Sequence, residues 1–339
     1  MRAHTVILGA GATIAAIPNG DKNGRHSSVM NGLIKKLALQ DILAGVNLST
    51  KSDNLEDIYS ELNSRKDCED VKEQLEKRLY DYFSLLELPD EPTIYDYLIL
   101  SLTDKDVIAT FNWDPLLIQA YIRCFNITDN LPHLLCLHGN VGMGFCEEHL
   151  EFGAIGARCP ICGKELPPTR LLYPIKDKNY NNDKYIKGCW DGVQEIIDKS
   201  YMLTIFGYSA PTSDRKAMKL LKKAWGKLDD RQLEEVSVID IIDENKMLKK
   251  WEKFIYTHHY RYTNNFFDSY LGLFPRRSCE MVFATKQLNI APDSTKGFKP
   301  NMSWDELMDH IYPLMCEEAE TEKGKNYPLH YVKKGYFKN

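Results

Sequence analysis

The chain of 339 residues has little that would suit it to a membrane or to nucleic acid. It lacks an uninterrupted apolar run of ~18 to 20 residues, the length of a membrane span, and it begins without a signal-peptide layout. It also lacks an excess of positive charge, since 43 Lys and Arg residues face 48 Asp and Glu residues. We therefore expect a cytoplasmic protein that crosses no membrane and makes no direct contact with nucleic acid.

A disulfide framework is not expected either. The nine cysteines are an odd number scattered through a long chain, which is unlike the dense, paired cysteines of small secreted domains. The hydrophobic content of 43% suffices for one large α/β domain or two smaller ones. Local clusters of cysteine then favour a metal site.

Continuous apolar runs predict five strands, at residues 5–8, 107–111, 134–137, 203–206 and 236–242. Strands that are apolar on both faces are typical of a parallel sheet covered by helices. Apolar residues three and four apart predict helices between them, at 29–37, 116–124 and 217–224. This alternation predicts an α/β fold with a Rossmann-like, doubly wound parallel sheet.

Two further segments extend this plan. About a hundred residues separate the first two strands, too many for a simple crossover, so we predict a helical insertion at about 46–105. A polar stretch at 291–300 suggests a linker, and Ser303 with Glu306 has the form of a capping box that opens another helix. The expected division is a main domain over 1–290 and a C-terminal helical extension over 291–339, which docks on the main domain or on a partner.

The sharpest chemical signal is a set of four metal-ligand side chains. Cys146 and His149 form one pair with two intervening residues, and Cys159 and Cys162 form another. Thiolates and imidazole at this spacing are typical of a zinc knuckle. Four protein ligands leave no position for a water, so we predict a structural Zn²⁺ in a small module at about 141–172. A redox pair would need a thioredoxin-like setting, which the neighbouring sequence lacks.

A glycine-rich turn follows the first strand and comprises Gly9, Ala10, Gly11, Ala12 and Thr13. Such a turn favours binding of a nucleotide pyrophosphate by backbone N–H groups; a tight turn without a ligand is the alternative. The dehydrogenase fingerprint needs a third glycine and an acidic residue ~20 positions further on. Neither is present, which argues against hydride transfer.

Polar side chains also follow the second and third predicted strands, where Asn112, Asp114 and His138 stand. Ligands of open α/β sheets bind at this edge, and histidine is the commonest general base. The alternatives are structural: Asp114 precedes Pro115 and suits a helix N-cap, and a lone histidine is often structural.

The loops after the last two predicted strands offer further nucleotide sites. Phosphate or ribose could lie against the backbone and hydroxyls of Gly207, Tyr208 and Ser209. The alternative is that Ser213 or Asp214, just beyond, serves as a helix N-cap. Asp240 and Asp243 could bind ribose hydroxyls, and a carboxylate there would repel a 2′-phosphate, which favours NAD over NADP.

Taken in order, these motifs resemble the sirtuin family, and more closely its divergent bacterial sirtuin-like branch. The resemblance spans roughly residues 5–245 and rests on Gly9-Ala10-Gly11-Ala12-Thr13, Asn112-Trp113-Asp114, His138-Gly139, Gly207-Tyr208-Ser209 and the zinc knuckle that follows the His-Gly pair. A further match is Ile17-Pro18-Asn19, where the family has Ile-Pro-Asp.

The resemblance implies an NAD-binding catalytic domain that cleaves the bond between nicotinamide and ribose. By that resemblance Asn112 would hold the nicotinamide ribose, Asp114 the carboxamide, and His138 would act as general base. The loops at Gly9 and Gly207 would hold the pyrophosphate and adenosine ends. Residues 17–19 would line the nicotinamide pocket.

Departures from the family pattern favour hydrolysis over deacylation. Phe111 replaces a glutamine and His149 replaces a zinc cysteine. The departure that bears on deacylation is Pro174, which interrupts the segment 171–180, where the family pairs with an acyl-lysine peptide. We therefore expect an NAD⁺ hydrolase that yields nicotinamide and ADP-ribose. The resemblance to the bacterial sirtuin-like branch implies a role in defence against phage, controlled by homo-oligomerisation or by a regulatory protein partner. The alternatives are an NAD-dependent protein lysine deacylase and a non-enzymatic module that senses NAD or ADP-ribose.

Overall fold

The computed structural model describes residues 3–175, 178–227, 229, 231, 234–255, 260–322 and 330–332. Its centre is a six-stranded parallel sheet with the order β3-β2-β1-β6-β7-β8. The strands are β1 (Ala3–Leu8), β2 (Val107–Thr110), β3 (His133–Cys136), β6 (Ser200–Phe206), β7 (Glu235–Ile239) and β8 (Tyr260–Thr263). Counted within the sheet the order is 3-2-1-4-5-6, which confirms the predicted doubly wound, Rossmann-like fold.

The direction of winding reverses between β1 and β6. Leu8 at the end of β1 pairs with Thr110 of β2 on one side and with Phe206 of β6 on the other. The loops that leave these three strands therefore emerge next to one another at the carboxyl edge of the sheet. In doubly wound folds this is where ligands bind.

Helices cover both faces of the sheet. Val6 and Leu8 of β1 belong to one hydrophobic cluster and Ile7 belongs to the other, as the two-residue period of a strand requires. The first face carries α1 (Ala10–Ala16), α6 (Ile94–Leu100), α7 (Leu116–Phe125), α11 (Tyr270–Leu273) and α12 (Ser278–Leu288). The second face carries α8 (Lys184–Lys199), α9 (Arg215–Trp225) and α10 (Glu244–Trp251).

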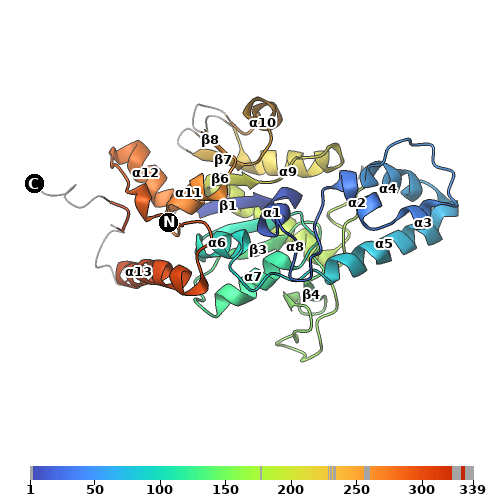
Figure 1. Ribbon diagram of the computed structural model, residues 1–339, viewed down its shortest axis with the longest axis horizontal. Helices are drawn as coiled ribbons and strands as arrows, with labels where there is room; N and C mark the ends of the chain where they lie inside the picture. Colours follow the sequence, from blue (N-terminus) through green and yellow to red (C-terminus); the bar gives the residue numbers. More distant parts are fainter. Residues whose placement is uncertain are drawn as a thin grey trace, which may run out of the picture.

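The long connection between β1 and β2 is helical, as the sequence predicts. Ahead of α6 it contains α2 (Met30–Lys36), α3 (Gln40–Leu43), α4 (Leu55–Asn63) and α5 (Glu69–Ser84), which lie at one end of the long axis of the molecule (Figure 1). Leu55, Leu62 and Leu79 join the same hydrophobic cluster as Leu8 of β1. These helices therefore share the core of the sheet, and the boundaries of 46–105 stay a prediction.

The predicted capping box opens the C-terminal helix α13 (Trp304–Glu322). Ser303 N–H donates to Glu306 Oε2 at 2.8 Å, and Glu306 N–H donates to Ser303 Oγ at 3.2 Å. The apolar face of α13 packs into the main core through Leu307, Ile311 and Leu314. It therefore docks on the body of the protein, at the opposite end from α3 and α4 (Figure 1). Parts of the predicted extension, 323–329 and 333–339, lie outside the described residues.

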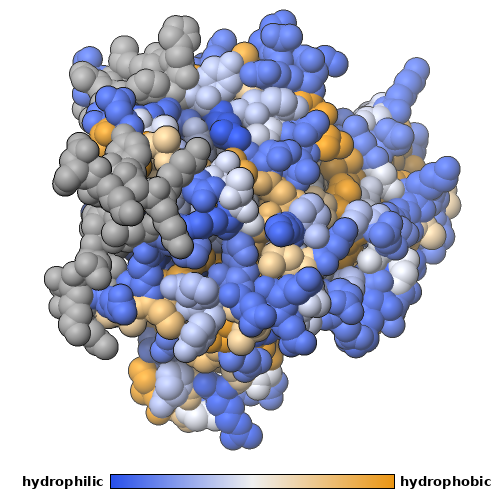
Figure 2. Space-filling model, turned by 60° about the vertical axis from the view of Figure 1, so that its left-hand side comes forward, coloured by the Kyte–Doolittle hydropathy of each residue, from blue (hydrophilic) through white to orange (hydrophobic). Residues whose placement is uncertain are grey.

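Hydrophilic side chains cover most of the face shown in Figure 2, with smaller apolar patches between them. Within the described part of the chain, we find no helix with the length and apolar content to cross a membrane.

Candidate active site and metal centre

A cavity of about 900 Å³ opens at the carboxyl edge of the sheet, where the winding reverses. It brings together residues from the ends of β1, β2, β3, β6 and β7. The predicted site residues that line it are Gly9, Ala10, Gly11, Pro18, Asn112, His138, Gly207, Tyr208, Ser209 and Asp240. Five separate sequence motifs thus contribute residues to one cavity.

The two glycine loops in the cavity wall touch each other directly. Gly11 N–H donates to Gly207 O at 2.9 Å, and Gly207 has a φ of +59°. A Cβ on Gly207 would lie 2.3 Å from the backbone nitrogen of Ala12, and a Cβ on Gly9 would lie 2.6 Å from Gly207 O. The glycines are therefore required by the close approach of the two loops as well as by the cavity.

This loop contact changes the predicted role of the backbone donors. The N–H groups of Gly9, Gly11 and Ala12 donate to the carbonyls of Phe206, Gly207 and Gly9, respectively. They are thus committed within the protein. Of the predicted pyrophosphate contacts at this turn, the one to Ala10, the first residue of α1, stays a prediction.

Asn112 projects from the end of β2 into the cavity and is held in place from behind. Its Nδ2 donates to Gly9 O at 2.9 Å and to Thr13 Oγ1 at 3.0 Å. No described residue is bonded to its Oδ1. The fixed amide can therefore present a carbonyl oxygen to a ligand hydroxyl.

Asp114 lies behind Asn112, and we do not find it among the described residues that line the cavity. Its Oδ2 accepts from Thr13 Oγ1 at 2.7 Å, and its Oδ1 accepts from Leu116 N–H at 3.2 Å in the first turn of α7. Burial raises its pKa to about 6. The carboxylate therefore supports the wall and the helix. The carboxamide contact that the resemblance implies for Asp114 stays a prediction.

Several other predicted binding residues have structural positions instead. Ala12, Thr13 and Ile17 are buried in the core, and Asn19 is exposed outside the described cavity lining. Asp243 accepts from the N–H groups of Asn245 and Lys246 and so caps α10. Of the two predicted ribose-binding carboxylates, Asp240 is the one that faces the cavity.

His138 forms part of the cavity floor at the end of β3. Only 5% of the residue is exposed, and its Nε2 has no hydrogen-bond partner among the described residues. Its ring lies edge-on to Phe111, with 4.8 Å between the ring centroids. Burial and the charge of Lys178 lower its pKa to about 3, against an opposing effect of Asp214. The imidazole is therefore neutral at physiological pH.

Lys178 and Asp214 are site residues whose role the sequence did not reveal. Lys178 Nζ contacts Asp214 Oδ1, and Asp214 Oδ2 accepts from Tyr208 Oη at 2.8 Å. Asp214 makes no side-chain cap on α9, which corrects the helix-cap alternative. Its position before a helix predicted a cap, and Lys178 lies in a polar stretch with no pattern that marks a buried lysine.

The segment after the zinc module packs beneath α4. Leu172 N–H donates to His138 O at 2.9 Å. Tyr173 stacks on Tyr59 of α4 with 5.5 Å between ring centroids, and Ser60 Oγ donates to Pro174 O at 3.4 Å. The helical insertion therefore covers the segment that the sequence marked as a poor edge for a peptide.

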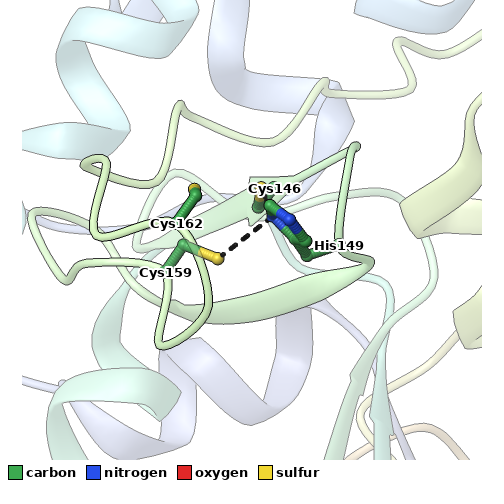
Figure 3. A group of neighbouring side chains, drawn as sticks. All are labelled: Cys146, His149, Cys159 and Cys162. Atoms are coloured by element: carbon green, nitrogen blue, oxygen red, sulfur yellow. Dashed lines mark hydrogen bonds between the residues drawn. The ribbon is translucent and has the colours of Figure 1, made fainter.

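The four predicted metal ligands converge in one cluster (Figure 3). Cys146 ends β4 (Met143–Cys146), which pairs with β5 (Glu151–Ala154), and Cys159 and Cys162 approach from the following loop. The four ligand atoms lie within 4.8 Å of one another.

The geometry of this cluster fits zinc. His149 Nδ1 lies 3.4 Å from Cys146 Sγ and 3.7 Å from Cys159 Sγ. Zinc bond lengths in a tetrahedral site imply a sulfur–nitrogen separation of roughly 3.6 Å. The backbone N–H groups of Cys162 and Ile161 lower the pKa of the Cys159 thiol to about 7, which favours the thiolate that a metal needs.

The fold and site define an α/β protein with a Rossmann-type sheet, a ligand cavity at its switch point and a Cys₃His cluster. No protein-family model matches the chain, and no curated protein matches it. It is similar to solved structures of Sir2 proteins, the family that its motifs resemble.

Three of these structures illustrate the likeness. A variant of a Sir2 homologue bound to ADP-ribose is 12% identical, with a TM-score of 0.39 over 93% of each chain. A Sir2 homologue in complex with NAD is 12% identical, with a TM-score of 0.35 over 92% of this chain and 90% of the other. A Sir2 protein bound to a myristoylated histone peptide is 13% identical, with a TM-score of 0.33 over 93% of each chain. At these values the superposition assigns no activity to this chain.

Proposed function

We propose that this chain is an NAD⁺ nucleosidase that hydrolyses the bond between nicotinamide and ribose. The observation that carries the proposal is the meeting of Asn112 and His138, from adjacent strand ends, in one cavity with the two glycine loops. The Nε2 atom of His138 is buried there without a described partner. A cavity of about 900 Å³ at a switch point is suited to a dinucleotide.

The reaction needs a base beside C1′ and a fixed orientation of the ribose. As the C1′–N bond breaks, its electron pair stays on the nicotinamide nitrogen and positive charge develops on the ribose. A water oxygen bonds to C1′, and a proton of that water passes to Nε2 of His138, giving ADP-ribose. Asn112 Oδ1 accepts a hydrogen bond from a ribose hydroxyl and holds C1′ in place.

Coverage of the segment 171–175 supports water as the nucleophile. A peptide that binds by strand addition needs a free backbone edge. Here Leu172 N–H is bonded to His138 O, and Tyr173 is stacked on α4. A deacylase would have to displace these contacts to admit an acyl-lysine peptide, whereas a water molecule needs no such opening.

Incubation of the purified chain with NAD, with and without a lysate of phage-infected cells, tests the proposal through release of nicotinamide. We expect turnover without any acylated peptide, and a loss of about 10²-fold or more in His138→Gln. His133→Gln is the matched control, because His133 is exposed at the other end of the same strand. Turnover that requires acyl-lysine peptide would favour the deacylase. Binding of NAD without turnover, even in the presence of infected lysate, would favour the sensing module.

We further propose that the Cys₃His cluster holds a structural Zn²⁺ and that the enzyme acts in the bacterial cytoplasm in defence against phage. Such an enzyme must be inactive until infection, which motivates the proposed homo-oligomer or regulatory partner. A plaque assay with the wild type and His138→Gln tests this role. Equal protection by the two would contradict a defence that depends on NAD cleavage.

A further inference from the structure

A buried ion pair lies beside His138 and takes no part in the reaction outlined above. Lys178 is 4% exposed and Asp214 is 3% exposed, and the two side chains contact each other through Lys178 Nζ and Asp214 Oδ1. The same Oδ1 lies 3.8 Å from Nε2 of His138, which is beyond hydrogen-bond distance. The carboxylate is thus bonded to the lysine and only adjacent to the imidazole.

The orientation of Asp214 is fixed from a second side. Its Oδ2 accepts a hydrogen bond of 2.8 Å from Tyr208 Oη, and the Tyr208 ring is stacked on Phe111 with 4.2 Å between ring centroids. Phe111 in turn contacts the ring of His138. Asp214 therefore cannot turn toward the imidazole without loss of the Tyr208 bond.

The charges around the imidazole come from few groups. In the described part of the chain, Asp214 approaches from the start of α9, Lys178 and Tyr180 from the segment before α8, and Tyr208 from the loop after β6. Glu56 of α4 acts on the ion pair and accepts from Ser213 Oγ. Burial raises the pKa of both tyrosines, so they stay neutral. Burial has the largest effect on the pKa of His138, and the charges that act on it are those of Lys178 and Asp214.

These two charges act on His138 in opposite directions. A lone carboxylate about 4 Å from an imidazole favours the protonated ring, by about 1 to 3 pKa units. A lysine bonded to that carboxylate offsets its charge. A protonated ring cannot accept a proton from water. Burial is the larger cause of the lowered pKa of His138, and the lysine keeps the Asp214 charge from opposing it.

We infer that Lys178 and Asp214 are positioning residues that act as a neutral buried pair to keep His138 uncharged and ready to accept a proton. The inference deepens the proposed NAD cleavage and rests on it for its catalytic consequence. Lys178 acts in this scheme through its positive charge, whereas Asp214 orients the lysine and Tyr208.

The pH profile of nicotinamide release tests the inference in variants of Lys178. Lys178→Met leaves Asp214 unbalanced, so we expect the acidic limb of the profile to move up by about 1 to 3 pH units. Lys178→Arg retains the charge and should retain the wild-type profile. The double variant Lys178→Met/Asp214→Asn lacks both charges, so the acidic limb of its pH profile should return toward the wild-type position. Lys187→Met, at an exposed site on α8, is the control and should change nothing.

Two kinetic outcomes would overturn the inference. A uniform fall in rate at every pH would assign Lys178 a purely structural role. A higher KM with an unshifted profile would mean that Lys178 contacts the substrate, for example its phosphates.

A titration by NMR separates this inference from the proposed activity. The His138 ring signal, assigned by its loss in His138→Gln, should not titrate between pH 5 and 8 in the wild type and should titrate at higher pH in Lys178→Met than in the wild type. If the wild type releases no nicotinamide but the titration shifts, the proposed hydrolysis fails and the charge offset stands. An unshifted titration refutes the offset whatever the activity.

Discussion

Asp114 is the residue whose protonation couples the site to folding. Burial raises its pKa from 3.8 to about 6 in the folded chain. The folded state therefore binds more protons than the unfolded state between these values, and stability falls as pH rises from about 4 to 6. Above that range the effect is constant.

Asp114→Asn should remove this pH dependence. The free energy of unfolding of the variant, relative to that of the wild type, should rise by about 2 to 3 kcal/mol from pH 4 to pH 7. Urea denaturation at the two pH values measures the difference. Asp243→Asn is the control, because Asp243 is an exposed helix cap. A relative stability of Asp114→Asn that does not change with pH would show that the carboxyl is ionised in both states.

Gly207 is the residue on which contact between the two cavity loops depends most. Gly207→Ala adds a Cβ at 2.3 Å from the Ala12 nitrogen at a φ of +59°, so we expect the loops to separate and NAD cleavage to be lost. Gly24→Ala is the matched control: Gly24 has a φ of +75° but open space around its Cβ position. The control should lose only about 1 to 2 kcal/mol from backbone strain. Melting temperatures and nicotinamide release compare the two, and equal effects would refute the steric explanation.

At the scale of the element, the zinc module should bind one metal ion and have no part in the chemistry. We expect a Zn²⁺ content near one per chain, lost in Cys162→Ser together with part of the thermal stability, because metal binding is coupled to local folding. Cys316→Ser is the control, since Cys316 is exposed on α13. Elemental analysis and thermal melting give both quantities. Zinc retained in full by Cys162→Ser would exclude the four-ligand site.

The strands that the sequence predicts best are those that are buried along their whole length. Strands β1, β2, β6 and β7 are buried along their whole length, so continuous apolar runs marked them. Strand β8 is half-buried at the edge of the sheet, and its alternation of Tyr260, Arg261, Tyr262 and Thr263 gave no such run. The last predicted run also ended early, at Ile239, because the chain turns to the cavity at Asp240.

Local motifs predict some residues of the candidate site, whereas their partners come from distant segments and could not be predicted. Motifs at strand ends placed Asn112, His138 and the glycine loops together, because the carboxyl ends of parallel strands meet at one edge. The partners of these motifs come from elsewhere: Tyr95 and Thr13 hold Asn112, and Lys178 reaches Asp214 across 36 positions. No local pattern encodes such pairs, since they form only when the loops have packed.

For the whole molecule, two buried arginines tie the C-terminal helix to the amino edge of the sheet. Arg276 donates to Glu318 through two bonds of 2.7 Å, and Arg277 donates to the same carboxylate at 2.7 Å. Arg276 also donates to the carbonyls of Leu102 and Asn130, which precede β2 and β3. One guanidinium thus joins three distant segments.

Glu318→Gln should therefore destabilise the whole chain. It leaves the buried Arg276 without its counter-charge, and loss of one partner of a buried pair costs about 3 to 5 kcal/mol. Asp191→Asn, in an exposed pair with Lys187, is the control and should not change the melting temperature. Calorimetry measures both. Because the cavity lies at the other edge of the sheet, residual NAD cleavage at low temperature should be normal; a selective loss of activity without destabilisation would contradict this division.

The bond between Gly11 and Gly207 joins the two glycine loops of the cavity wall, which under the proposed function hold the two parts of a dinucleotide. A ligand that settles on one half finds the other half already in place, so no further ordering is needed. AMP and nicotinamide mononucleotide, supplied as separate molecules, would each contact only one part of this wall. NAD joins the two halves covalently, so once one half is bound the other is present at a high effective concentration. We therefore expect NAD to bind much more tightly than either half alone.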